Sequence, residues 1–223
     1  MRIFISKKPE TLARFVGRST YDAYLGCMMV PPQSSYITNM DIVWGMDNGR
    51  FVCLDFDKRT WHPDRWDRDS FMRMIERKRD IPGNKFVVAP DVLLNAQATT
   101  TEYQQWHEII REQGYPVAYS IQDGITHNLV PWDTMDALFV GGSNKVKFSK
   151  TCRAIVHEAK ARGMWVHWGR ASTAGFINYA KTIGCDSVDS SAFARFTNKE
   201  LPTAIQLLKH NQLALFDDWS INQ

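Results

Sequence analysis

The sequence predicts an α/β protein built on a closed, compact (β/α)8 barrel of the TIM-like type, in a single domain spanning residues 1–223. Between residues 85 and 189, short apolar runs alternate with segments at helical spacing, which is typical of βα units on a parallel sheet. The apolar runs contain no polar alternation, as expected of strands buried on both faces. The length also fits, because a minimally decorated barrel of this kind needs about 200 to 250 residues.

Seven or eight strands can be placed along the chain. In order, the candidate strands are residues 2–5, 25–30, 43–46, 86–89, 117–121, 137–140, 164–168 and 187–188. Pro31-Pro32 stops the second strand, and residues 31–40 are expected to form a loop. Residues 51–56 alternate in polarity and are interpreted either as a further strand or as part of an excursion from the barrel.

Helices are predicted where apolar residues recur three or four positions apart. These apolar residues fall within 71–75, 103–110, 152–159, 176–183 and 201–208. Asp69 or Ser70 is expected to cap the first helix, and Thr99 with Glu102 fits a capping box for the second. Natural helix stops follow three of them, at Gly114, Gly163 and Gly184. An open doubly wound sheet is the alternative fold, but no glycine-rich phosphate motif follows the first strand.

The composition of the chain argues against a membrane-spanning, disulfide-rich or cysteine–zinc protein. The formal net charge of +3 permits a polyanionic partner without requiring one. The four cysteines are far apart and form no CxxC pair, so we expect neither a cysteine zinc site nor a disulfide framework. The N-terminus becomes charged too early for a signal peptide, and no apolar run approaches the roughly 18 residues of a membrane helix. We therefore expect a soluble, cytoplasmic protein with free thiols.

Polar residues follow five of the predicted strands at the point where each strand ends. They are Asp47-Asn48-Gly49, Asp91, Gln122-Asp123-Gly124, Gly141-Gly142-Ser143 and Asp189. Because the carboxyl ends of parallel strands meet at one rim of a barrel, we expect these groups to converge there. Carboxylates and amides in one place suit recognition of a polar planar ligand together with acid–base or nucleophilic chemistry.

Simpler interpretations exist for several of these residues. Ordinary turns or loop caps would also explain the motifs at Asp47, Asp91 and Gln122. Asp186 is an alternative to Asp189 as the reactive carboxylate, but it precedes the strand tip, so we prefer Asp189. His167 lies between two tryptophans in an apolar strand and is interpreted as a core histidine with satisfied hydrogen bonds.

Together the motifs resemble those of tRNA-guanine transglycosylases, from about residue 42 to 191. The segments Asp47-Asn48-Gly49-Arg50-Phe51, Asp91, Gln122-Asp123-Gly124, Gly141-Gly142 and Asp186-Ser187-Val188-Asp189 are similar, in order, to the family's Asp-Ser-Gly-Gly-Phe, second-strand aspartate, Gln-Gly-Gly, Gly-Gly and Asp-Met-Phe-Asp. The resemblance is closest to the short phage-type branch, DNA transglycosylases that exchange guanine for a 7-deazaguanine. The blocks Asp-Asn-Gly-x-Phe, Val-x-x-Pro-Asp-Val, Phe-Val-Gly-Gly-Ser and Trp-Val-His-x-Gly-Arg carry that resemblance.

The tRNA enzymes carry a zinc subdomain with a CxCxxC cluster beyond the nucleophile. Here 34 residues follow Asp189 and none is a cysteine. This departure from the tRNA enzymes predicts no metal, no zinc subdomain and no cofactor, and it favours DNA over tRNA as the partner. The resemblance to the phage-type branch implies a glycosyltransferase that inserts a free preQ0-type base. It also implies that the protein acts in the cytoplasm of the host if the gene is phage-encoded.

The resemblance further implies residue roles. Asp189 is expected to attack C1′ of the sugar and form a covalent glycosyl-enzyme, with Asp47 as the general acid/base. The expected base-binding residues are Asp91, Gln122, Gly141, Gly142 and Phe51. The target guanine has to be flipped out or single-stranded. The alternatives are a DNA glycosylase that hydrolyses the bond, a tRNA-guanine transglycosylase, and an inactive nucleic-acid-binding barrel.

Basic residues follow the Gly-Gly tip directly. We predict that Lys145 and Lys147 contact nucleic-acid phosphates, giving affinity that falls steeply with salt. Arg170, at the end of its strand, is predicted either to bind a phosphate or to form a surface salt bridge. The mixed charges at residues 65–80 are interpreted as a solvated helix face.

Overall fold

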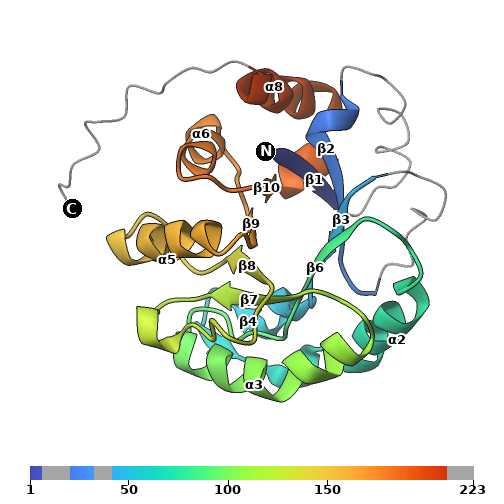
Figure 1. Cartoon of the computed structure of the whole chain (residues 1–223), viewed down its shortest axis with the longest axis vertical. Helices are drawn as coiled ribbons and strands as arrows, with labels where there is room; N and C mark the ends of the chain where they lie inside the picture. The colour runs from blue at the N-terminus through green and yellow to red at the C-terminus, as the bar shows by residue number, and fades with distance from the viewer. Residues whose placement is uncertain (7–20, 33–41, 210–223) are drawn as a thin grey trace.

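The computed structural model of the chain describes residues 1–6, 21–32 and 42–209. Eight parallel strands close into a barrel and follow their order along the chain (Figure 1). The barrel strands are β1 (Arg2–Ser6), β2 (Leu25–Met29), β3 (Trp44–Met46), β6 (Asn84–Val88), β7 (Val117–Ile121), β8 (Ala137–Val140), β9 (Trp165–Trp168) and β10 (Ser187–Asp189). The barrel closes where β1 pairs with β10, with Phe4 opposite Asp189. The predicted parallel barrel is confirmed, and the open sheet is excluded.

Seven α-helices surround the barrel within the described residues (Figure 1). They are α2 (Arg68–Lys78), α3 (Ala96–Glu112), α4 (Asn144–Lys147), α5 (Lys150–Ala161), α6 (Ala174–Thr182), α7 (Ser191–Arg195) and α8 (Thr197–Lys209). The five helices predicted from apolar spacing are α2, α3, α5, α6 and α8, whereas α4 and α7 are too short to show that spacing. Between β7 and β8 the chain forms only a 3-10 turn, η4 (His127–Leu129), so the regular strand–helix alternation is broken there. None of the described helices has the length and apolarity needed to cross a bilayer.

Two predicted helix starts are wrong by several residues. Asp67, not Asp69 or Ser70, caps α2, because its side chain accepts the Ser70 N–H at 2.9 Å. Asn95 caps α3 in the same way, and Thr99 lies inside the helix with its hydroxyl donating to the Asn95 carbonyl at 2.8 Å. The predicted stops are confirmed, with positive φ at Gly114, Gly163 and Gly184.

Aromatic rings fill the barrel interior. Phe4 and Phe86 stack with ring centroids 6.1 Å apart, and both are fully buried. The neighbouring strands accommodate these rings through glycine, because a Cβ at Gly26 would lie 2.2 Å from the Phe4 ring and one at Gly45 would lie 2.4 Å from Phe86. A second, larger apolar layer lies between the barrel and its helices. The interior is therefore solid, and a ligand site has to lie at a rim.

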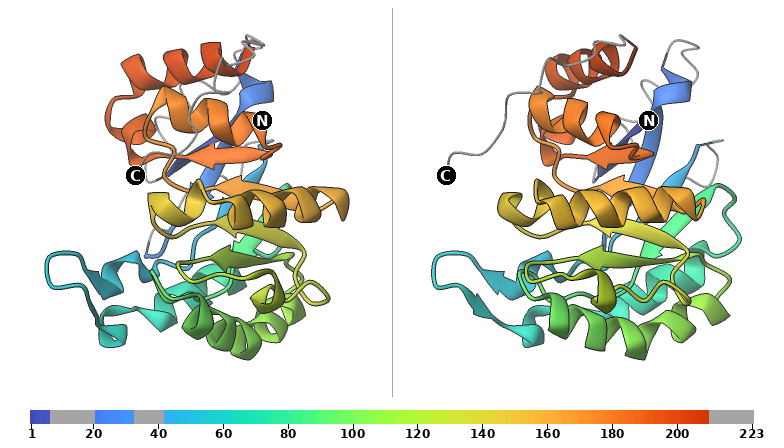
Figure 2. Two further views of the ribbon diagram at one scale, coloured as in Figure 1. Left: turned by 90° about the vertical axis from the view of Figure 1, so that its left-hand side faces the viewer. Right: turned by 60° about the vertical axis from the view of Figure 1, so that its left-hand side comes forward.

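Residues 47–67, between β3 and β6, leave the barrel wall and project from its side; we call this segment the β3–β6 excursion (Figure 2). It contains η2 (Arg50–Cys53), β4 (Leu54–Asp55), β5 (Thr60–Trp61) and η3 (Pro63–Arg65), and β4 and β5 pair as an antiparallel ribbon. Residues 51–56 thus belong to an excursion from the barrel, which confirms the second of the two interpretations. The predicted loop at 31–40 falls largely outside the described residues.

A buried arginine anchors the β3–β6 excursion. The guanidinium of Arg50 lies 4.9 Å from the centroid of Trp66 and 5.3 Å from that of Trp61. It also pairs with Glu102 of α3 at 2.9 Å. The Trp66 indole N–H donates to the Asn48 carbonyl at 2.8 Å. These contacts fix the tip of β3 and hold the start of η2 beside the rim.

Candidate active site

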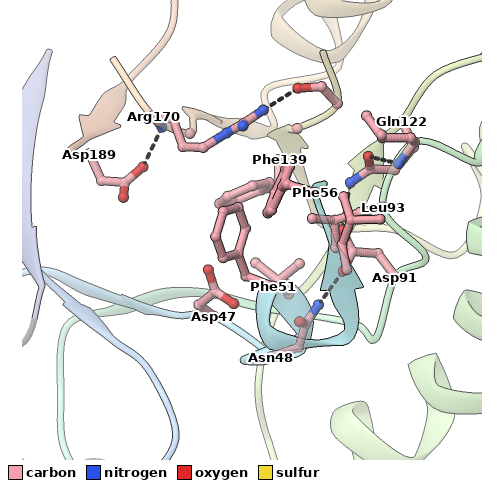
Figure 3. Close-up of a pocket in the computed structure, with 16 residues that line it drawn as sticks. Asp47, Asn48, Phe51, Phe56, Asp91, Leu93, Gln122, Phe139, Arg170 and Asp189 are labelled. Atoms are coloured by element: carbon pink, nitrogen blue, oxygen red, sulfur yellow. Dashed lines mark hydrogen bonds between the residues drawn. The ribbon is translucent and has the colours of Figure 1, made fainter. Parts of the chain in front are cut away.

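A pocket opens at the carboxyl-terminal rim of the barrel, with an empty volume of about 620 Å³ that includes open solvent (Figure 3). It is lined by Asp47, Asn48, Phe51, Leu54, Phe56, Val88, Asp91, Leu93, Leu94, Gln122, Phe139, Gly141, Gly142, Gly169, Arg170 and Asp189. The structure thus brings together every predicted catalytic and base-binding residue, along with Arg170. In Figure 3 the carboxylates of Asp47 and Asp189 lie on one side, with Asp91 and Gln122 on the other.

Asp189 ends β10 and presents a polarised carboxylate. Its Oδ1 accepts the backbone N–H of Arg170 at 2.9 Å and lies 3.2 Å from His167 Nε2. Its Oδ2 has no hydrogen-bond partner among the described residues. Burial raises the pKa of Asp189, but the His167 and Arg170 contacts and the nearby Lys147 charge outweigh it, so the pKa lies below its ordinary value. An ionised carboxylate with one unbonded oxygen is suited to nucleophilic attack.

Asp186 lies at the opposite end of the same strand. Its carboxylate pairs with Lys160 at 2.6 Å and accepts the Val166 N–H at 2.7 Å. Its carbonyl accepts the N–H of Arg2, at the start of β1. Of the two carboxylates, only that of Asp189 lines the pocket.

Asp47 follows β3, where it closes a turn and also lines the pocket. Its Oδ1 accepts the Gly49 N–H at 2.8 Å, which closes a turn. That turn needs the left-handed backbone of Gly49, with φ of +78°. The carboxyl group nevertheless faces the pocket (Figure 3). The turn holds the carboxylate in place at the rim.

A buried network of amides holds Asp91. Asn48 Nδ2 donates to Oδ1 at 3.0 Å and Gln122 Nε2 donates to Oδ2 at 2.7 Å. Burial raises the pKa of Asp91, and hydrogen bonds from Asn48, Ser120 and Gln122, with the nearby Arg50 charge, only partly oppose that shift. An ionised carboxylate has about four lone-pair sites, so Asp91 can also accept a hydrogen from a ligand.

Gln122 lines the pocket, and its amide forms hydrogen bonds within the protein. Its Nε2 donates to Asp91 and Ser120, and its Oε1 accepts the Leu94 N–H at 2.9 Å. The amide is therefore used within the protein, and it positions Asp91. Asn48 acts in the same way. Asn48 was not predicted as a site residue, because an Asn-Gly pair is also typical of a simple turn.

The two glycines at the tip of β8 allow close approach of the backbone to the pocket. A Cβ at Gly141 would lie 2.8 Å from Gln122 Nε2, and Gly142 has a φ of +72°. The Gly142 carbonyl accepts the Arg170 guanidinium, and its N–H has no acceptor among the described residues. That N–H is a donor available to a ligand oxygen.

The predicted phosphate contacts separate into two groups. Lys145 and Arg170 are exposed, and Arg170 forms no salt bridge with a described residue. The prediction for Lys147 is wrong, because it is 1% exposed and donates to the Gly169 carbonyl under the rim. Its place in the short helix α4 turns it inward, packing its ammonium 5.5 Å from the Trp168 ring centroid.

His167 is buried in the barrel as predicted, and it also contacts Asp189, which was not predicted. Within residues 1–6, 21–32 and 42–209, no group of three or more His, Cys, Asp or Glu side chains is placed to hold a metal ion.

The sequence matches no model of a known protein family, and no curated protein is significantly similar to it.

Proposed function

We propose that the protein is a DNA base-exchange transglycosylase that replaces guanine by a free 7-deazaguanine of the preQ0 type. The observation that carries the proposal is the shared pocket of Asp47 and Asp189, which follow or end strands far apart along the chain, β3 and β10. The resemblance of the strand-tip motifs to tRNA-guanine transglycosylases supplies the substrate class. In this proposal the barrel is a compact TIM-like one without a zinc subdomain.

In the first half-reaction, Oδ2 of Asp189 attacks C1′ of the target nucleotide and the bond from C1′ to guanine N9 breaks. Asp47, in its protonated form, gives a proton to the departing guanine. The product is a glycosyl ester on Asp189 and a neutral free base. This scheme follows the logic of retaining glycosidases, in which one carboxyl attacks and the other transfers the proton.

In the second half-reaction, the incoming base takes the place of guanine. Asp47, now ionised, accepts the proton from its N9, and that nitrogen attacks C1′ as the bond to Asp189 breaks. The same two carboxyls therefore serve both directions, and no proton is gained or lost over the cycle.

In this proposal, the residues on the other side of the pocket recognise the base. The oxygens of Asp91 can accept the N1–H and 2-amino hydrogens that guanine and 7-deazaguanines share, and the Gly142 N–H can donate to O6. A base lacking these groups leaves buried polar atoms unpaired and is rejected. Phe51, 51% exposed at the mouth and in contact with Phe56, offers a face for stacking.

The test is release of labelled guanine from DNA in the presence of a free 7-deazaguanine, with mass analysis of the digested nucleosides. The wild type should show both guanine release and insertion of the new base. Asp189→Ala should abolish both. Turnover in that variant would remove Asp189 from the role of nucleophile. Free guanine with an abasic site and no insertion would contradict base exchange and indicate a hydrolytic DNA glycosylase.

A further inference from the structure

We propose that His167 is the positioning residue for the nucleophile: a neutral imidazole, with its hydrogen fixed on Nε2, that donates to Asp189 Oδ1 and so directs Oδ2 at the sugar. The proposal rests on the proposed function of Asp189. It assigns a role to a histidine that the base-exchange scheme does not otherwise use.

A chain of three hydrogen bonds fixes the ring. Trp165 Nε1 lies 2.8 Å from Ser187 Oγ, Ser187 Oγ lies 2.8 Å from His167 Nδ1, and His167 Nε2 lies 3.2 Å from Asp189 Oδ1. The indole N–H can only donate, so Ser187 accepts there. Among the described residues, the remaining partner for the serine hydrogen is His167 Nδ1. Nδ1 is thus an acceptor, and the single hydrogen of the neutral ring lies on Nε2.

The other forms of the ring fit the same contacts poorly. A hydrogen on Nδ1 alone would leave the serine hydroxyl without an acceptor and would point the Nε2 lone pair at a carboxylate oxygen. The imidazolium form would also leave the serine hydroxyl without an acceptor. Both forms leave a buried polar hydrogen unpaired, which is unfavourable in a dry interior.

The surroundings of the ring also disfavour a charge. His167 is fully buried and lies among Phe4, Phe86 and Phe139, with ring centroids 5.4, 5.2 and 5.1 Å away. Burial lowers the pKa of His167, the contact with Asp189 raises it, and the Lys147 charge lowers it again, for a net lowering. The imidazole is therefore held as a neutral donor and does not act as a proton carrier.

The consequence for Asp189 is a difference between its two oxygens. Both donors, His167 Nε2 and the Arg170 N–H, act on Oδ1. Negative charge is stabilised there, and Oδ2 remains available to attack. Arg170 adopts a left-handed backbone, with φ of +59°, to deliver its N–H. The same two donors favour departure of the carboxylate when the second base attacks C1′.

The functional test compares His167→Leu, which removes the donor, with His167→Gln, whose amide N–H can reach the same oxygen. His167→Leu should lower kcat for guanine exchange by about 10- to 100-fold, the equivalent of one hydrogen bond to a charged group, with little change in KM for DNA. The acid limb of its pH profile should move to higher pH, because Asp189 loses a donor. His167→Gln should restore most of the rate and the profile.

A second variant tests the proposal in case His167→Leu does not fold. Ser187→Ala deletes one small group, leaves the imidazole free to place its hydrogen on Nδ1, and should lower kcat by about 10-fold. A wild-type rate and acid limb in His167→Leu or in Ser187→Ala would overturn the proposal.

A measurement on the resting protein separates this proposal from the proposed function. In ¹⁵N-histidine NMR at pH 7, with His167→Gln used to assign the signal, His167 should appear as the neutral Nε2–H tautomer. A Nδ1–H tautomer, or the imidazolium form at pH 7, would overturn the positioning role even if base exchange occurs. Absence of base exchange by the wild type, with the Nε2–H tautomer present, would reject only the proposed function.

Discussion

Lys147→Met is expected to stabilise the fold, although it removes a charged group beside the candidate nucleophile. Lys147 is 1% exposed, and burial, together with the nearby Arg170 charge, lowers the pKa of its ammonium from 10.5 to about 7, while Asp189 opposes the shift. At about 1.4 kcal/mol per pKa unit, the charged form costs about 5 kcal/mol below pH 7. Against this gain, the variant loses the hydrogen bond to Gly169 and the contact with Trp168, and each loss costs it about 1 kcal/mol of stability. The net expected gain at pH 6 is about 3 kcal/mol.

The gain should depend on pH in a defined direction. Between the folded pKa of about 7 and the unfolded value of 10.5, the unfolded chain binds more protons at Lys147 than the native state does. The contribution of Lys147 to the free energy of unfolding of the wild type therefore rises with pH across that window. The Lys147→Met variant lacks this contribution, because methionine does not titrate. The advantage of the variant should shrink by about 2 to 3 kcal/mol between pH 6 and pH 9.

Urea unfolding at pH 6 and pH 9 measures this difference directly. Lys145→Met is the matched control, because Lys145 lies two residues earlier in the same helix and is exposed. Its free energy of unfolding should stay within about 0.5 kcal/mol of the wild type at both pH values. A Lys147→Met advantage that is absent, or that is equal at pH 6 and pH 9, would refute the reasoning.

Four further predictions follow from the site and the barrel. Asp91→Asn should weaken binding of a free 7-deazaguanine by at least about 10-fold in calorimetry, because an amide places a donor opposite the donors of the base; unchanged affinity would remove Asp91 from recognition. Phe51→Ala should weaken binding of a single-stranded guanine oligonucleotide by about 1 to 3 kcal/mol in fluorescence anisotropy, and equal binding would exclude stacking. Lys145→Met should reduce the slope of log K against log salt for DNA by about 1, and the same slope as wild type would exclude a phosphate contact. Gly26→Ala should cost about 1 to 3 kcal/mol in urea unfolding, since its Cβ would lie 2.2 Å from the Phe4 ring; no loss would show that the interior can relax.

The barrel and its rim could be predicted because their signals are local. Apolar runs flanked by helical spacing define the strands, and polar residues placed after those runs must meet once the sheet closes. Asp47 and Asp189 could therefore be placed at one site, though they lie far apart in the chain. Asn95 was missed as a cap because Thr99 with Glu102 offered a stronger local pattern, whereas the chain enters α3 earlier, where the Ala96 N–H bonds the Asp123 carbonyl.

The remaining features depend on which face of an element a side chain occupies. Lys147 follows a glycine pair among other lysines, and only the orientation of α4 shows that it points inward. The pairing of Asn48 with Asp91 requires knowledge that β3 and β6 are neighbours. His167 reaches Asp189 because β9 pairs with β10, placing His167 opposite Ser187 in the register. Such contacts between strands leave no mark in the local sequence.

Covalent capture tests the central claim most directly. The wild type is incubated with a guanine-containing single-stranded oligonucleotide without an incoming base, denatured, and examined by intact mass and peptide mapping. The account predicts a protein–DNA adduct, lacking guanine, on the peptide that contains Asp189, and no adduct in Asp189→Asn. An adduct on another residue, or one that persists in Asp189→Asn, would contradict it.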